Sequence, residues 1–129
     1  SGQGEYTKPD IVRDFAEKSG VDILAVSVGN EHGAPKGERL DLALLGEIGK
    51  ITPVPLVMHG ASGLDERDVI AAVKCGVVKL NIDTNIRKAF VDNFSEKHPG
   101  VKDPREILTE AKNEAKEIVK RYISILSGR

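Results

Sequence analysis

The 129-residue sequence has little of what disulfide-bonded, membrane or nucleic-acid-binding proteins need. Its single cysteine, Cys75, excludes a disulfide within the chain and favours a reducing, cytoplasmic setting. No apolar run approaches the roughly 18 residues of a membrane helix. The net charge of -1 gives no basic surplus for nucleic acid or an anionic membrane, and two tyrosines, three phenylalanines and no tryptophan leave few side chains for stacking on bases. We therefore predict a cytoplasmic protein that binds neither nucleic acid nor membrane.

What the sequence does contain is an alternation of apolar strands and amphipathic helices. Apolar runs predict strands at residues 21–28, 54–58 and 77–82. Residues suited to cap helices precede five helical patterns: Thr7 with Asp10, Asp41, Asp65, Asp83 with Thr84, and Asp103. Strands that alternate with helices at this spacing form right-handed βαβ units, so the sequence predicts an α/β fold with a parallel sheet.

The first and last helices have recognisable apolar patterns. The first is expected to end at Gly20 and to carry Ile11 and Phe15 on its apolar face. The last is expected to begin at Asp103-Pro104, where proline suits the first helical position. One buried stripe is predicted along it from residues three and four apart: Ile107, Leu108, Ala111, Ala115, Ile118, Val119, Tyr122 and Leu126.

Polar residues of types suited to binding or catalysis follow each predicted strand. They are His32 with Lys36, His59 with Ser62, and Asn81 with Asp83 and Thr84. The carboxyl ends of parallel strands form the ligand side of such sheets. In the turn after His59, Gly60, Ser62 and Gly63 can bring backbone N–H groups to an anion near a helix N-terminus. The pattern predicts a cation ligand beside an anion site.

Each of these features also has a plainer interpretation. A lone histidine after a buried strand is more often hydrogen-bonded within the structure than a metal ligand, and two at equivalent positions leave both interpretations open. Glycine-rich turns follow strands for steric reasons alone, Lys36 can be an ordinary loop lysine, and Asp83-Thr84 can be a helix cap. Three strands also leave both sheet edges unpaired, so we expect the chain to be an incomplete barrel or sheet.

Three of these stretches form motifs that occur together in one enzyme family. Residues 28–33 read VGNEHG, residues 56–63 read LVMHGASG, and residues 79–84 read KLNIDT. In this order they resemble the class II, zinc-dependent fructose-1,6-bisphosphate aldolases, and the resemblance extends from about Thr7 to the C-terminus. It implies a (β/α)8 TIM barrel, of which residues 1–129 form a single partial domain: the C-terminal half, with strands six to eight and their helices.

The resemblance assigns roles position by position. It implies that His32 and His59 bind Zn²⁺ and that Asn81 is catalytic, hydrogen-bonding the ketose near the reacting carbons. It implies a set of residues that hold substrate phosphate: Gly33, Lys36, Gly60, Ser62, Asp83 and Thr84. Arg87 is expected to reach a phosphate or a neighbouring subunit, or to have only a surface role.

The implied activity is the reversible cleavage of fructose 1,6-bisphosphate into dihydroxyacetone phosphate and glyceraldehyde 3-phosphate. The resemblance places the third zinc histidine and the general base in the first half of the barrel, so we expect this chain alone to be inactive. It also implies a homo-oligomer, a dimer or a tetramer. Asp83 favours fructose bisphosphate; the alternatives are an aldolase for tagatose bisphosphate or another phosphorylated ketose, and a metal-free, non-catalytic phosphate-binding half-barrel.

Overall fold

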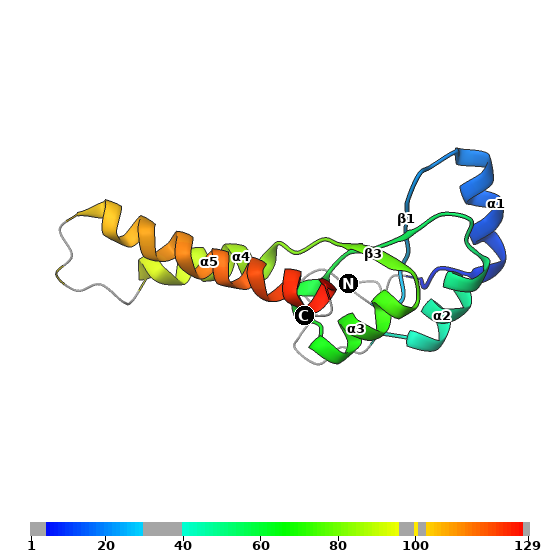
Figure 1. The fold of residues 1–129 in the computed structure, drawn as a ribbon. Coiled ribbons are helices and arrows are strands. Elements are labelled where there is room, and N and C mark those ends of the chain that lie inside the picture. The colour runs from blue at the N-terminus through cyan, green and yellow to red at the C-terminus, as the bar shows by residue number, and fades with distance from the viewer. Residues whose placement is uncertain (1–4, 30–39, 96–99, 101–102, 128–129) are drawn as a thin grey trace. The chain divides into compact units, whose positions relative to one another are not determined.

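The computed structural model describes residues 5–29, 40–95, 100 and 103–127 (Figure 1). The elements in chain order are α1 (Pro9–Ser19), β1 (Leu24–Ala25), α2 (Leu42–Ile51), β2 (Leu56–Met58), the 3-10 turn η1 (Ala61–Gly63), α3 (Glu66–Lys74), β3 (Val77–Leu80), α4 (Thr84–Ser95) and α5 (Pro104–Ser127). The chain divides into two compact units, Ser1–Asn81 and Ile82–Arg129. Among the described residues, no helix combines the length and the apolarity that crossing a membrane requires. The predicted alternation of helices and strands is confirmed.

The three strands form one parallel sheet in the order β1-β2-β3, as the sequence predicts. The side chains of Leu56, Val57 and Met58 in β2 are all buried, which confirms that this central strand is covered on both faces. Leu24 N–H donates to the carbonyl of Pro55 at 3.0 Å, so β1 pairs with the start of β2.

β1 is shorter than the predicted strand, and Ser27, which lies just after it, is hydrogen-bonded to the segment before α1. Thr7 N–H donates to the carbonyl of Ser27, and Ser27 N–H donates to Thr7 Oγ1, both at 2.8 Å. The backbone of Ser27 therefore pairs with the segment before α1, on the side of the strand that faces away from β2. Thr7 is not the predicted helix cap: Lys8 occupies the N-cap position of α1, without a side-chain capping bond.

The predicted apolar face of α1 is also wrong. Ile11 and Phe15 are each 54% exposed, whereas Val12 and Ala16 are buried. The buried pair lies one helical turn apart on the side that packs against α2, and the small Ala16 side chain lets the two helices approach closely. The helix itself ends at Gly20, as predicted, with a left-handed φ of 65°.

An extra residue in β3 decides which way its side chains face. Leu56 pairs with Val77, whereas Val57 pairs with Lys79, so Val78 is bulged out of the register. Paired residues on neighbouring strands share a face, and successive residues in a regular strand alternate. Val77 therefore faces the same side as Leu56, and Lys79 lies on the opposite side with Val57.

The core of the first unit lies between one face of the sheet and helices α1 to α3. Its buried members are Val12, Val26, Val28, Leu40, Leu45, Ile48, Leu56, Met58, Ala72 and Val77. The helix α2 is capped as predicted, because Asp41 Oδ1 accepts a hydrogen bond from Leu44 N–H at 2.9 Å. It ends at Thr52.

The second unit consists of α4 and α5, which pack side by side. Asn85 Nδ2 of α4 donates to the hydroxyl of Tyr122 of α5 at 3.2 Å. The predicted start of α5 is confirmed: Asp103 Oδ1 accepts from Arg105 N–H at 2.9 Å. Hydrogen bonds from Arg105, chiefly from its side chain and also from its backbone, hold the pKa of the partly exposed Asp103 carboxyl below its usual value.

The single buried stripe predicted for α5 is only partly present. Ala111 is fully buried, but Leu108, Val119 and Leu126 remain exposed. The shorter length of α4 is not by itself the reason, because Val119 lies between Ala111 and Tyr122, and Tyr122 contacts α4. Within the described part of this unit, α4 covers only one side of the longer helix.

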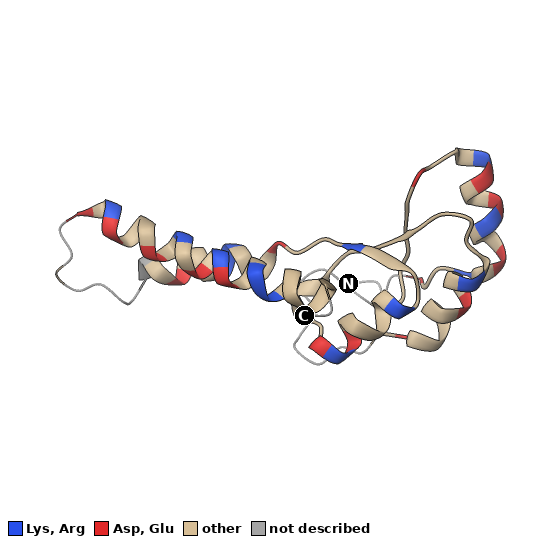
Figure 2. Cartoon of the chain, viewed as in Figure 1, with Lys and Arg blue, Asp and Glu red and all other residues tan. Residues whose placement is uncertain are grey.

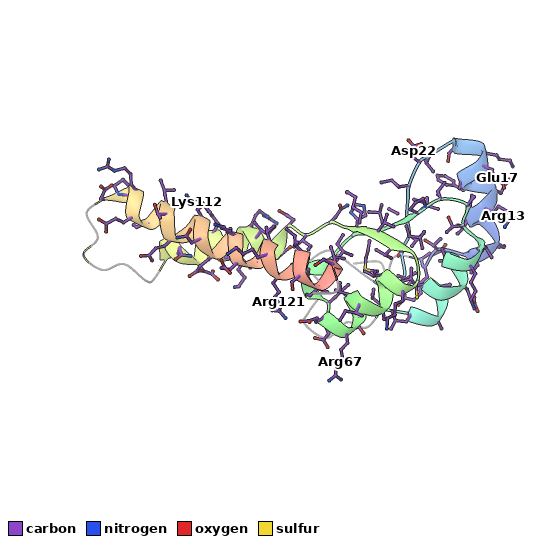
Figure 3. All side chains as sticks on the ribbon, in the orientation of Figure 1. Arg13, Glu17, Asp22, Arg67, Lys112 and Arg121 are labelled. Carbon is purple, nitrogen blue, oxygen red and sulfur yellow. The ribbon has the colours of Figure 1, made fainter. Side chains whose placement is uncertain are left out.

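Acidic and basic residues are interspersed along the helices, as Figure 2 shows for α5. Local ion pairs follow from this mixture, including Lys120 with Glu117 at 2.6 Å and Lys18 with Asp14 at 2.8 Å. Side chains such as Lys112 and Arg121 point away from α5 (Figure 3). Exposed pairs of this kind contribute little to stability.

Candidate functional site

The ends of β2 and β3 bring His59 and Asn81 together. His59 follows the last residue of β2, and Asn81 follows the last residue of β3. Asn81 N–H donates to the carbonyl of Met58 at 2.8 Å, which continues the pairing of the two strands. The side chains meet, because Asn81 Nδ2 lies 3.1 Å from each ring nitrogen of His59. The structure thus places two of the candidate residues in contact, and their roles remain predictions.

The amide of Asn81 lies over a face of the His59 ring. A point 3.1 Å from both ring nitrogens cannot lie in the ring plane, because there it would overlap the Cε1 atom. The contact is therefore an N–H directed at the aromatic face, which is a weak hydrogen bond. A metal binds histidine along the in-plane lone pair of a ring nitrogen, and Asn81 does not cross that direction. The contact with Asn81 therefore does not prevent the exposed imidazole of His59 from binding a metal.

Lys79 joins this pair, although the sequence reasoning did not select it. Its Nζ atom donates to Asn81 Oδ1 at 2.5 Å. An ammonium group donates hydrogen bonds and never accepts them, so it fixes the amide oxygen toward Lys79 and the amide nitrogen toward His59. Lys79 is the first residue of the KLNIDT motif and stands two residues before Asn81. The period of two along a strand would have placed both on one face and was a usable signal.

The turn after His59 leads to α3, which has the predicted N-cap residue, Asp65, but no capping hydrogen bond. Gly60 has a left-handed φ of 65°, which favours glycine, and Ser62 is half-buried in η1. The helix α3 begins only at Glu66, after the N-cap Asp65, whose side chain makes no capping bond. Glu66 and Asp68 already place acidic groups in the first turn of α3. Any anion beside His59 would therefore depend on the backbone and hydroxyl of the turn more than on the dipole of α3.

Asp83, Thr84 and Arg87 belong to the start of α4 in the second unit. The guanidinium of Arg87 donates to both carboxylate oxygens of Asp83, from Nε to Oδ1 at 3.0 Å and from Nη2 to Oδ2 at 2.9 Å. The Asp83 carboxylate is thus already hydrogen-bonded to a cation. A phosphate at this point would be held by Arg87 or by backbone N–H groups, because a carboxylate repels it.

Three predicted site residues, His32, Gly33 and Lys36, lie outside the described residues. In residues 5–29, 40–95, 100 and 103–127, no group of three His, Cys, Asp or Glu side chains is close enough to hold a metal ion. Of the two predicted zinc ligands, the described residues include His59.

Comparisons with known proteins agree with the motifs. The family model described as fructose-bisphosphate aldolase class-II matches residues 1–129. The solved structure of the YdjI aldolase from Escherichia coli K12 is 30% identical over 93% of this chain, with a TM-score of 0.78. That of fructose-bisphosphate aldolase from Campylobacter jejuni is 26% identical over 95% of this chain, with a TM-score of 0.77. This chain covers 44% and 45% of those chains, less than half of each.

Proposed function

On the premise that this chain belongs to the class II fructose-bisphosphate aldolase family, we propose that it is half of a ketose-bisphosphate aldolase. The fold is the C-terminal half of a TIM barrel, as the motifs implied. The reaction we propose is the reversible cleavage of fructose 1,6-bisphosphate into dihydroxyacetone phosphate and glyceraldehyde 3-phosphate. The observation that carries this proposal is the contact of Asn81 with His59 at the carboxyl ends of neighbouring strands.

His32 and His59 would hold Zn²⁺, with a third histidine from the first half of the barrel. Zinc accepts imidazole nitrogen readily, and a catalytic site uses three protein ligands and one open position. Bound there, the ion supplies a Lewis acid for the negative charge that develops when the carbon–carbon bond breaks. The exposed ring of His59, with Asn81 over its face and not in its plane, suits this role.

Asn81 would donate its amide N–H to a ketose oxygen beside the reacting carbons. Its nitrogen already points toward His59, so no rotation of the amide is needed before substrate binds. A donor aimed at an oxygen that gains negative charge lowers the barrier more than it strengthens substrate binding.

The phosphate groups would bind to the turns that follow the three strands in sequence. Gly60, whose backbone has a left-handed φ of 65°, directly follows His59. The hydroxyl of Ser62 lies two residues further along the chain. Gly33, Lys36 and Thr84 complete the proposed set, and Asp83 would act through Arg87, with which it is paired. Phosphates far from the reacting bond supply binding energy that fixes orientation, so these positions should affect both affinity and rate.

We extend the proposal to the assembly. Residues 1–129 would be one partial barrel domain that requires the first half to complete the metal site and to supply the general base. The completed subunit would form a homo-oligomer, a dimer or a tetramer, in the cytoplasm. Its substrate is a small sugar bisphosphate, and the Asp83 position favours fructose over tagatose bisphosphate by resemblance to the family.

Zinc content and substrate cleavage test the proposal together. In a protein that contains this chain and the first half of the barrel, we expect stoichiometric zinc and cleavage of fructose 1,6-bisphosphate in preference to tagatose 1,6-bisphosphate. His59→Ala should lose both the zinc, measured by atomic absorption, and the cleavage, whereas His98→Ala, outside the three motifs, should lose neither. A zinc-free active protein, or an unchanged zinc content in His59→Ala, would exclude the proposed metal site.

A further inference from the structure

Lys79, Asn81 and His59 form a continuous chain of side-chain contacts across β3 and β2. Lys79 Nζ lies 2.5 Å from Asn81 Oδ1, and Asn81 Nδ2 lies 3.1 Å from both ring nitrogens of His59. Lys79 pairs with Val57, which lies on the sheet face opposite the helices. Two residues further along, His59 follows Val57 and Asn81 follows Lys79, so strand alternation places all three side chains on that face.

A side-chain amide can face its surroundings in two ways. The oxygen accepts hydrogen bonds and the nitrogen donates them, so a rotation by half a turn exchanges one chemistry for the other. Lys79 discriminates strongly between the two orientations, because an ammonium can pair with the oxygen and is repelled by the amide N–H group. The face of the His59 ring favours the same orientation only weakly, through its contact with the amide N–H group.

Lys79 reaches this position through the irregularity in β3. Without the extra residue Val78, strand alternation would put Lys79 and Asn81 on the same face as Val77, among the helices. The bulge moves both side chains to the opposite face together and keeps them two residues apart. Bulges that redirect side chains in this way are frequent beside active sites.

We propose that Lys79 is a positioning residue that holds Asn81 with its amide N–H, and not its carbonyl, toward the reaction centre beside His59. The inference rests on the proposed function, since it assigns how one group of that site is oriented. If the amide were reversed, its oxygen would face a substrate oxygen that gains negative charge, and the two would repel. Loss of Lys79 should therefore lower the rate of the chemical step and leave substrate binding nearly unchanged.

Kinetics of three variants test this in the protein that contains both halves of the barrel. We expect Lys79→Met to lower kcat about tenfold while KM changes less than about twofold. Lys79→Arg should recover most of the loss, because a guanidinium also donates and never accepts. Lys112→Met is the matched control: it removes the same charge from an exposed side chain that points away from α5 (Figure 3), and kcat should stay at the wild-type value.

The side-chain amide of Asn81 gives a readout that does not depend on catalysis. Its ¹H–¹⁵N pair, assigned by its disappearance in Asn81→Asp, should shift in Lys79→Met and stay in place in Lys112→Met. An unshifted amide, a rise in KM at constant kcat, or an equal loss in Lys79→Arg and Lys79→Met would each overturn the inference. A wild-type protein that cleaves no ketose bisphosphate, with the amide still shifted in Lys79→Met, would overturn the proposed function and uphold the Lys79 contact.

Discussion

At the scale of single residues, the motifs were enough to select His59 and Asn81 but not their orientation. A histidine and an asparagine that each follow a buried strand can be read from the order of residues alone. The sequence alone did not predict a role for Lys79, because a lysine in a strand is usually solvated. Only its 2.5 Å contact with Asn81 Oδ1 distinguishes it from the other exposed lysines.

Gly49 offers a test of packing at this scale. A Cβ atom added to Gly49 would lie 2.0 Å from the carbonyl oxygen of Cys75, a backbone atom that cannot move without shifting the end of α3. Gly49→Ala should lower the free energy of unfolding by about 2 kcal/mol or more, measured by urea denaturation.

Gly46 in the same helix is the matched control for that measurement. Among the described residues, an added Cβ there would meet only Cys75 Sγ, at 3.8 Å, which is an ordinary contact. Because alanine is the better helix former, Gly46→Ala should be neutral or stabilising by up to about 1 kcal/mol. Equal effects of the two substitutions would show that α2 and α3 do not approach as closely as the structure indicates.

At the scale of elements, capping residues predicted the helices better than apolar patterns predicted their buried faces. The helices α2 and α5 begin where Asp41 and Asp103 indicated. The prediction of the buried face of α1 was wrong, because Ile11 and Phe15 fit an amphipathic pattern as well as Val12 and Ala16 do. The choice between the two faces depends on the position of α2, and the sequence of residues 9–19 holds no information about that position.

Two aspartates at equivalent positions test the value of a capping hydrogen bond. Asp41 and Asp65 are the N-caps of α2 and α3. Of these two side chains, only that of Asp41 accepts a capping hydrogen bond, from Leu44 N–H at 2.9 Å. Asp41→Ala should lower the free energy of unfolding by about 1 kcal/mol. Asp65→Ala should cost clearly less. Thermal or urea denaturation would measure both, and a larger loss for Asp65→Ala would contradict the observed caps.

At the scale of the whole molecule, the sheet corresponds to part of the barrel in the aldolase structures that the chain matches. β2 pairs on both sides, whereas among the described residues β1 and β3 each pair on one side only. The chain matches less than half of the aldolase structures it resembles. The second unit similarly leaves Leu108, Val119 and Ile123 of α5 exposed. Unpaired strand edges and exposed apolar side chains both favour association with further protein.

Hydrogen exchange tests whether the first half of the barrel pairs with these edges. In the 129-residue chain by itself, backbone amides of β1 and β3 that point away from β2 should exchange much faster than those between the strands. Addition of the first half should slow their exchange, read residue by residue by NMR. The amides of α2, which are bonded within the helix, serve as the internal reference. Unchanged exchange at both edges would refute the pairing.

The order of residues by itself determined the local features of this protein. It determined the alternation of strands and helices, the caps of α2 and α5, and the motifs that identify the family, because these depend on residues a few positions apart. Tertiary structure alone decided the register of β3. Val78 is an extra residue only because Leu56 pairs with Val77 and Val57 pairs with Lys79, which leaves Val78 without a partner position on β2. That long-range pairing, which no local pattern encodes, turns Lys79 and Asn81 toward His59 and away from the core.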